Sequence, residues 1–120
     1  MENKLKIGVF GSGEYEEKDR IYSILDKNID KIKFVVSNDN KGPSKTVQEW
    51  AKERGAICVT CHAMTHVNGV FDKSSGYKNN YRALKICDVV LIFNKGNSRG
   101  ATLIEEMAND LQKDVRVIRV

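Results

Sequence analysis

Six consecutive residues in the C-terminal third of the chain read Asp88-Val89-Val90-Leu91-Ile92-Phe93. After the aspartate every position is apolar, so both faces of a strand built from these residues would be buried. This pattern is typical of a central strand in a parallel sheet, which carries helices on both sides. The stretch therefore predicts an α/β fold organised around residues 88–93.

The flanking sequence supplies the other strands and the helices. Apolar runs at residues 5–10, 33–37, 56–61 and 115–120 alternate with segments of helical periodicity at residues 17–30, 44–54, 76–86 and 101–111, and residues 62–75 are expected to be irregular. The alternation predicts a Rossmann-like three-layer sandwich with a five-stranded, mainly parallel sheet. With 120 residues, 41% of them hydrophobic, we expect one domain over residues 1–120.

Charge and hydropathy limit the partners to be expected. Twenty Lys and Arg residues against sixteen Asp and Glu residues give a net charge of +4, and the basic residues are spread along the chain. Nucleic acid is therefore expected to be an unlikely partner. No stretch approaches the roughly 20 apolar residues of a membrane span, and the N-terminus lacks a signal sequence, so we expect no membrane contact and a cytoplasmic protein.

The cysteine pattern raises the question of a metal or haem site. The segment Cys58-Val59-Thr60-Cys61-His62 has the spacing of a haem-attachment motif, and with His66 it also offers zinc ligands. If residues 56–61 form a strand, however, side chains three positions apart point to opposite faces and the two sulfurs cannot converge. We therefore expect free thiols, no metal and no cofactor.

Candidate binding residues lie in two glycine-rich loops that follow predicted strands. In parallel sheets, ligands bind at the carboxyl ends of the strands, where the strand order reverses. Bare backbone amides, hydroxyls and one guanidinium beside a helix start suit a phosphate group. The dinucleotide fingerprint fails, because Glu16 stands at its third glycine, and no P-loop motif occurs. The candidates from the two loops are Gly11, Ser12, Gly13, Gly96, Ser98, Arg99, Gly100 and Thr102.

Several short motifs occur together at consistent spacings: Gly11-Ser12, Gly42, Trp50-Ala51, Asn80, Asp88 and Ser98-Arg99-Gly100. In this combination the chain resembles the YspA-type branch of the SLOG superfamily, a Rossmann-like group that also contains the LOG cytokinin-activating enzymes and the DprA core. The resemblance implies a nucleotide-binding domain and a homo-oligomer, and it adds Asn80 as a polar ligand contact.

These observations favour one function and leave two alternatives. The favoured function is binding of a nucleotide-derived small molecule, a nucleoside phosphate or an ADP-ribose-like compound, by a sensor or sequestering protein. The first alternative is an N-glycoside hydrolase, a phosphoribohydrolase of nucleoside 5′-monophosphates similar to the LOG enzymes. Ile104 occupies the place of their catalytic glutamate, so Glu105 or Glu106 would be the catalytic residue. The second alternative is single-stranded nucleic-acid binding, which requires a basic groove with stacking aromatic residues.

Overall fold

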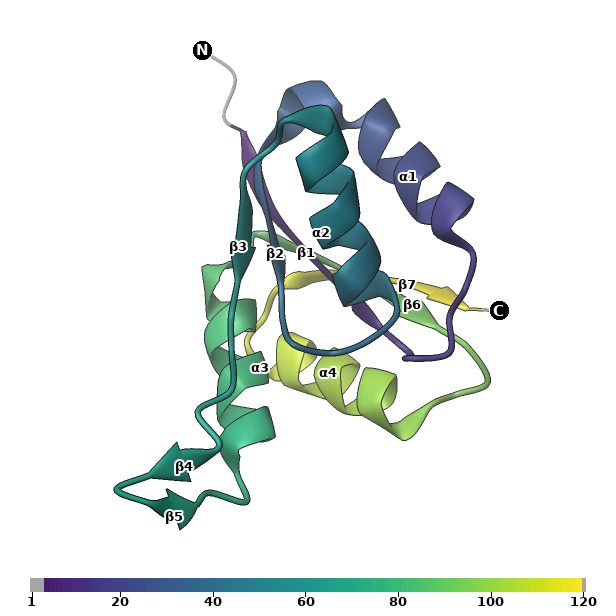
Figure 1. Cartoon of the computed structure of the whole chain (residues 1–120). Coiled ribbons are helices and arrows are strands. Elements are labelled where there is room, and N and C mark those ends of the chain that lie inside the picture. Colours follow the sequence, from purple (N-terminus) through teal and green to yellow (C-terminus); the bar gives the residue numbers. More distant parts are fainter. Residues whose placement is uncertain (1–3, 120) are drawn as a thin grey trace.

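The computed structural model describes residues 4–119 and contains a parallel sheet of five strands between two layers of helices (Figure 1). The strand order is β3-β2-β1-β6-β7. The strands are β1 (Leu5–Gly11), β2 (Ile32–Ser37), β3 (Cys58–Thr60), β6 (Val89–Asn94) and β7 (Asp114–Arg119). The predicted Rossmann-like α/β fold is confirmed; Val120, the last residue of the predicted strand 115–120, lies outside the described residues.

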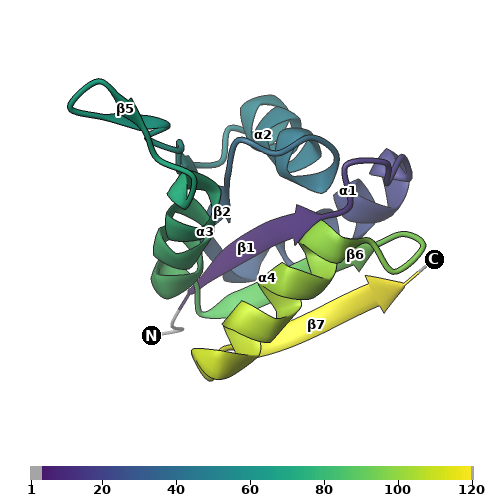
Figure 2. The ribbon, with the colours of Figure 1, turned by 90° about the horizontal axis from the view of Figure 1, so that it is seen from below.

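Each face of the sheet is covered by one pair of helices (Figure 2). Helices α1 (Lys18–Lys27) and α2 (Pro43–Arg54) cover one face, and α3 (Ser75–Ile86) and α4 (Arg99–Asp110) cover the other. Successive residues of a strand point to opposite faces, so Val9 of β1 belongs to the first core and Phe10 to the second. A single 3-10 turn (Ile29–Lys31) connects α1 to β2.

The core under α1 and α2 contains the only tryptophan of the chain. Trp50 is fully buried, and its indole N–H donates to Asp26 Oδ1 at 2.8 Å. Arg54 Nε donates to the same oxygen at 2.9 Å. Charge-assisted hydrogen bonds from Arg54, with the indole bond, hold the pKa of Asp26 below its ordinary value. The indole is therefore held in place by the carboxylate of Asp26, which Arg54, on the same helix as Trp50, fixes in turn.

The strand order reverses between β1 and β6. From β1 the chain moves outward through β2 to β3, and it then returns to place β6 on the other side of β1. The loops that leave the carboxyl ends of β1 and β6 therefore lie at the switch point where ligands bind in such sheets. This is the arrangement that the sequence predicts for its two glycine-rich loops.

Residues 62–75, expected to be irregular, contain a small antiparallel hairpin. Its strands β4 (His66–Val67) and β5 (Val70–Phe71) are joined by Asn68 and Gly69, both with positive φ (53° and 79°). Such a pair suits a type I′ turn, which Asn-Gly sequences favour. The hairpin projects from the body of the molecule in both views (Figures 1 and 2).

Within residues 4–119, none of the helices combines the length and the apolar character needed to cross a membrane.

Candidate functional site

A solvent-open hollow of about 670 Å³ lies at the carboxyl edge of the sheet. It is formed by the loops that follow β1, β2 and β6 together with the first turn of α4. We call it the loop hollow; its lining residues are Gly11, Ser12, Gly13, Glu14, Asn40, Lys41, Lys95, Gly96, Ser98 and Gly100. Six of the nine predicted contact residues thus lie together in one place.

The serine hydroxyls in the loop hollow bond to the protein itself. Ser12 Oγ accepts the backbone N–H of Lys95 at 2.8 Å and lies 2.8 Å from Ser98 Oγ. The buried side chain of Asn94 accepts the N–H of Ser98 at 2.9 Å, and its oxygen lies 3.2 Å from Ser12 Oγ. These contacts fasten the loop after β1 to the loop after β6. Ser12 and Ser98 therefore hold the two walls together.

Two glycines allow the loops to approach this closely. A Cβ on Gly11 would come within 2.2 Å of the carbonyl oxygen of Phe93, on the neighbouring strand β6. A Cβ on Gly42, whose φ is +77°, would come within 2.4 Å of the carbonyl oxygen of Ser12. No larger residue fits either place without backbone movement. Gly13 and Gly100, by contrast, have room for a side chain and leave the floor of the hollow bare.

The segment 98–102 forms the start of α4. Ser98 is the N-cap residue, and its Oγ accepts the N–H of Ala101 at 3.3 Å. The hydroxyl of Thr102 donates to the carbonyl of Ser98 at 2.9 Å, so it is directed to the helix backbone. Arg99 is exposed on the first turn beside Ser98 and Gly100, but it does not line the loop hollow. Among the described residues its side chain has no ion-pair partner.

Two cations that were not among the predicted contact residues line the loop hollow. Lys41 follows β2 and Lys95 follows β6, both are exposed, and neither forms an ion pair within residues 4–119. Glu14 is the one carboxylate among the lining residues. The signal was present in the sequence, because both lysines follow a predicted strand, and loops that follow parallel strands lie at the carboxyl edge of the sheet. The first turn of the 12-residue helix α4 adds partial positive charge at the same edge.

The other predicted site residues lie away from the loop hollow. Asn80, on α3, accepts a hydrogen bond from the amide of Asn38 at 2.9 Å. Glu105 pairs with Arg119 of β7 at 3.1 Å, and Glu106 faces a groove between α3 and α4. Neither glutamate reaches the loop hollow, so the two residues named for the hydrolase alternative are not brought to the glycine-rich loops.

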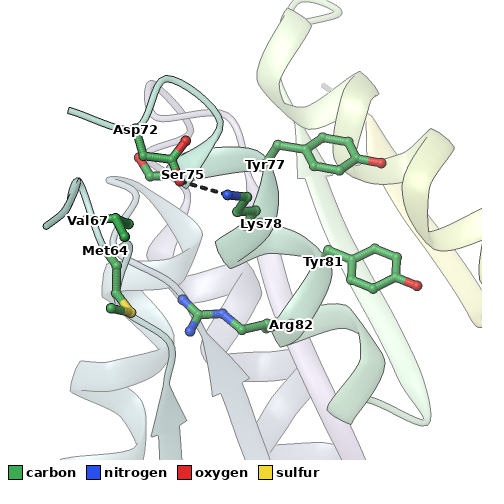
Figure 3. Close-up of a pocket in the computed structure, with 8 residues that line it drawn as sticks. All are labelled: Met64, Val67, Asp72, Ser75, Tyr77, Lys78, Tyr81 and Arg82. Atoms are coloured by element: carbon green, nitrogen blue, oxygen red, sulfur yellow. Dashed lines mark hydrogen bonds and ion pairs between the residues drawn. The ribbon is translucent and has the colours of Figure 1, made fainter. Parts of the chain in front are cut away.

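A second hollow, of about 610 Å³, lies between α3 and the segment 64–75 that contains the hairpin. We call it the tyrosine hollow; it is lined by Met64, Val67, Asp72, Ser75, Tyr77, Lys78, Tyr81 and Arg82. Figure 3 shows the two tyrosines on one side of α3, with Lys78 and Arg82 on the side of Met64 and Val67. Tyr77 and Tyr81 also line the groove toward α4, so they form a ridge between two depressions, which we call the tyrosine ridge.

The base of the hairpin segment is bound firmly to the rest of the molecule. Asp39 pairs with His62 and accepts the N–H of Ala63 at 2.6 Å. Arg82 Nη2 donates to the carbonyl of His62 at 3.0 Å, and Asn79 Nδ2 donates to the carbonyl of Cys61 at 2.9 Å. The loop after β2 and helix α3 therefore both position the segment that carries the hairpin.

The cysteines lie as the strand geometry requires. Cys58 packs against the core under α1 and α2, and Cys61 packs against the core under α3 and α4, so the two sulfurs face opposite sides of the sheet. All three cysteines are unpaired, and burial raises the pKa of the Cys87 thiol to about 12. Among residues 4–119, no three His, Cys, Asp or Glu side chains gather as a metal site would require.

No protein-family model and no curated protein matches this sequence. A solved structure of DNA processing protein A (DprA) from Helicobacter pylori, described for its single-stranded DNA binding mode, matches with a TM-score of 0.74 and 17% sequence identity. The match covers 96% of this chain and 65% of the DprA chain. At this identity the likeness shows the fold, a Rossmann-like domain with a five-stranded parallel sheet.

This comparison corrects two expectations. We expected the ligand to be a nucleotide-derived small molecule, and we expected nucleic acid to be an unlikely partner. Both expectations are wrong, because the protein that shares the fold is described as binding single-stranded DNA. The error has a physical source: a net charge averaged over the chain conceals local groups of cations such as Lys41 and Lys95. The chain is therefore similar in fold to a protein that is described as binding single-stranded DNA.

Proposed function

We propose that this protein binds single-stranded nucleic acid, with the phosphate backbone seated in the loop hollow. The observation that carries the proposal is that Lys41 and Lys95, from two different loops, flank a floor of bare glycine backbone. Cations that track a phosphodiester chain along an open groove are a general feature of single-strand binding. The fold likeness to a single-stranded-DNA-binding DprA supports the same choice.

The chemistry of the loop hollow suits a strand that is held at its phosphates. Lysine pairs with phosphate as a mobile point charge, which tolerates the varied geometry of a flexible strand. Gly13 and Gly100 place no side chain over the floor, so a phosphate can come close to the backbone. Arg99, exposed on the first turn of α4, extends the positive rim. On this proposal Ser12, Ser98 and Gly11 fix the shape of the hollow, while Gly13, Gly96 and Gly100 border the strand.

We also propose that the chain belongs to the SLOG superfamily, in its YspA-type branch. The support is the set of motif residues, which lie where such a fold uses them. Gly42 abuts Ser12 at the crossing of two loops, Trp50 and Ala51 are core residues, and Ser98 caps the helix that follows the central strand. The fold likeness to DprA agrees with the superfamily.

The proposed function is tested with a fluorescein-labelled 20-nucleotide oligo(dT) by fluorescence anisotropy between 50 and 200 mM salt. The parent protein is expected to bind, with affinity falling as salt rises. The variant Lys41→Ala/Lys95→Ala should bind more weakly. The plot of log K against log salt should also become shallower by about 1.4, because each lost phosphate contact on a single strand contributes about 0.7.

The matched control removes two lysines from the opposite edge of the sheet. Lys27 ends α1 and Lys31 immediately precedes β2, so both lie at the amino end of the strands. Lys27→Ala/Lys31→Ala has the same net charge as the test variant and should retain the affinity and slope of the parent. Absence of saturable binding by the parent at 50 mM salt, with both DNA and RNA oligonucleotides, would contradict the proposal. Equal loss in both double variants would show non-specific attraction only.

A further inference from the structure

The net positive charge of the protein is concentrated in about one fifth of its sequence. Residues 62–86 contain four basic side chains, Lys73, Lys78, Arg82 and Lys85, and one carboxylate, Asp72, which gives +3 of the net +4. The same segment holds six of the nine large apolar side chains that are exposed in the described structure: Met64, Val67, Val70, Phe71, Tyr77 and Tyr81. A region that is both cationic and apolar at its surface is suited to a ligand with charged and aromatic parts.

Helix α3 separates these two properties on adjacent faces. Tyr77 and Tyr81 stand one turn apart, with 63% and 38% of their surface exposed, and Lys78 and Arg82 follow them directly in sequence. Each step along a helix turns by about 100°, so Lys78 and Arg82 lie beside the rings. Lys85, one turn after Tyr81, places its Nζ 5.5 Å from the centroid of the Tyr81 ring and leaves the other face of that ring open to a base. Figure 3 shows this division, with the tyrosines on one side of α3 and the two cations on the other. The backbone positions of the two tyrosines are about 6 Å apart along the helix axis, at 1.5 Å per residue.

The tyrosine ridge is connected to the loop hollow by one short loop. Asn38 at the start of this loop bonds to Asn80, which stands on α3 between the two tyrosines. Asn40 and Lys41, two and three residues further on, line the loop hollow. A chain molecule that leaves the loop hollow along this loop therefore arrives at Tyr77 and Tyr81 without crossing a core element.

The charges near the ridge determine how such a ligand would lie. Glu106 and Asp110 border the groove on the α4 side, so phosphates are repelled there. Lys78 and Arg82 occupy the hairpin side. Lys78 already pairs with Asp72 at 2.8 Å. Arg82 uses Nη2 to bond His62 and Asn79, so the N–H groups of its Nε and Nη1 can still donate to a phosphate. The backbone of a strand is therefore favoured on the hairpin side, with its bases over the rings.

We infer that Tyr77 and Tyr81 form a base-stacking platform for single-stranded nucleic acid, with Arg82 as a phosphate contact on the neighbouring side of α3. This inference rests on the proposed function and extends it by a second subsite with a different chemistry. The loop hollow holds phosphates and is insensitive to the bases, whereas the tyrosine ridge binds the bases themselves. Stacking on aromatic side chains strengthens single-strand binding by roughly tenfold or more per base.

The test compares two labelled 20-mers of equal charge, oligo(dT) and an abasic deoxyribose-phosphate strand. The parent should bind oligo(dT) at least about tenfold more tightly than the abasic strand. Tyr77→Leu/Tyr81→Leu should reduce the affinity for oligo(dT) to that for the abasic strand, with the salt dependence unchanged. Tyr77→Phe/Tyr81→Phe, which keeps both rings, should retain the preference. Both positions are partly or largely exposed, so the variants are expected to fold.

Leucine is chosen because it distinguishes a nucleic acid from other apolar ligands. A lipid surface or an apolar peptide would still bind the leucine variant, since leucine offers comparable apolar surface, and binding of anionic vesicles is measured in parallel. As a measurement on the unaltered protein, a 5-iodouracil oligonucleotide should crosslink on irradiation to the peptide that contains Tyr77 or Tyr81.

The outcomes separate the two proposals. If the parent binds neither strand, the proposed function and the platform both fail. If it binds both strands equally, or if the leucine variant binds oligo(dT) as the parent does, the platform fails and the loop hollow stands. Binding of vesicles that is stronger than binding of oligo(dT) and is retained by the leucine variant would assign the ridge to a membrane and overturn the inference.

Discussion

Gly11 has no Cβ, and both the packing of the central strands and the shape of the loop hollow depend on the absence of this atom. It ends β1 directly against the carbonyl of Phe93, and a Cβ at this position would also come within 2.9 Å of Pro43 Cγ on α2. Because backbone atoms on β6 cannot move without breaking the ladder with β1, the contact cannot be relieved by rotating a side chain. The close approach of the two loops that form the hollow therefore requires a glycine at position 11.

Gly11→Ala is expected to lower the free energy of unfolding by about 1–3 kcal/mol, the usual cost of overpacking. The matched control is Gly100→Ala, at an open position in the first turn of α4, which should be neutral or stabilising by up to about 1 kcal/mol. Urea unfolding followed by circular dichroism measures both. An alanine at position 11 that leaves the urea midpoint unchanged would show that the close approach is not needed.

The roles of individual hydroxyls mark the limit of what the sequence reveals at this scale. Ser12, Ser98 and Thr102 lie in or beside the loops that leave the carboxyl edge of the sheet, but their hydroxyls bond to neighbouring loops and to the helix backbone. A hydroxyl donates and accepts equally well toward a ligand or toward protein, and only the three-dimensional neighbours determine which. Backbone proximity, as at Gly42 and Ser12, is equally invisible in the sequence.

At the scale of elements, the turn before α3 depends on Asp72. Its carboxylate accepts from the backbone N–H of Ser74 at 2.9 Å, from the Ser74 hydroxyl at 2.7 Å and from Lys78 Nζ at 2.8 Å. The bond from Lys78, followed by those from Ser74, lowers the pKa of Asp72 to about 2. These bonds connect the end of the hairpin to the first turn of the helix that carries the tyrosine ridge.

We expect the Asp72 carboxyl carbon to titrate near pH 2 in a ¹³C NMR titration. Because the folded-state pKa is depressed, the stabilisation is fully present above the ordinary pKa of about 3.9 and is lost as the pH falls toward 2. Lys78→Met, which removes the largest cause of the shift, should raise the pKa toward the ordinary value. A titration near pH 4 in the parent would show that the Asp72–Lys78 pair does not form in solution.

The elements themselves were largely predictable, and the exceptions have identifiable causes. Buried strands such as β6 and amphipathic helices such as α4 have strong hydrophobic periodicity, which a single sequence displays. The hairpin was missed because each of its strands is two residues long and exposed, although Asn68-Gly69 is a recognised turn signal. The lysines of the loop hollow were missed because lysines are common at surfaces and show no periodicity.

At the scale of the whole molecule, the hairpin stands apart from the folding unit. Val67, Val70 and Phe71 are exposed, and no residue from 66 to 71 belongs to either core cluster. The backbone N–H of Asp72 donates to the carbonyl of Thr65 at 2.7 Å, so the chain enters and leaves the hairpin at one point. Replacing residues 66–71 by two glycines would leave the same bond spanning a four-residue β-turn.

This shortened protein is expected to unfold within about 2 °C of the parent in a thermal scan, because the removed residues contribute no core packing. The comparison variant is Leu84→Ala, a fully buried position on α3, which should cost about 2–5 kcal/mol. A fall of the melting temperature in the shortened protein as large as that caused by Leu84→Ala would show that the hairpin is part of the cooperative fold.

The hydrogen bond that holds the Trp50 indole makes its fluorescence a specific signal for unfolding. The indole of Trp50 is buried on the face of the sheet opposite α3, and its N–H is fixed by Asp26. Its emission therefore changes when the α1–α2 layer opens to water, and a strand arriving at the tyrosine ridge does not touch it. Unfolding can then be followed by intrinsic fluorescence in the presence of a labelled oligonucleotide, so stability and occupancy are measured in the same cuvette as separate signals.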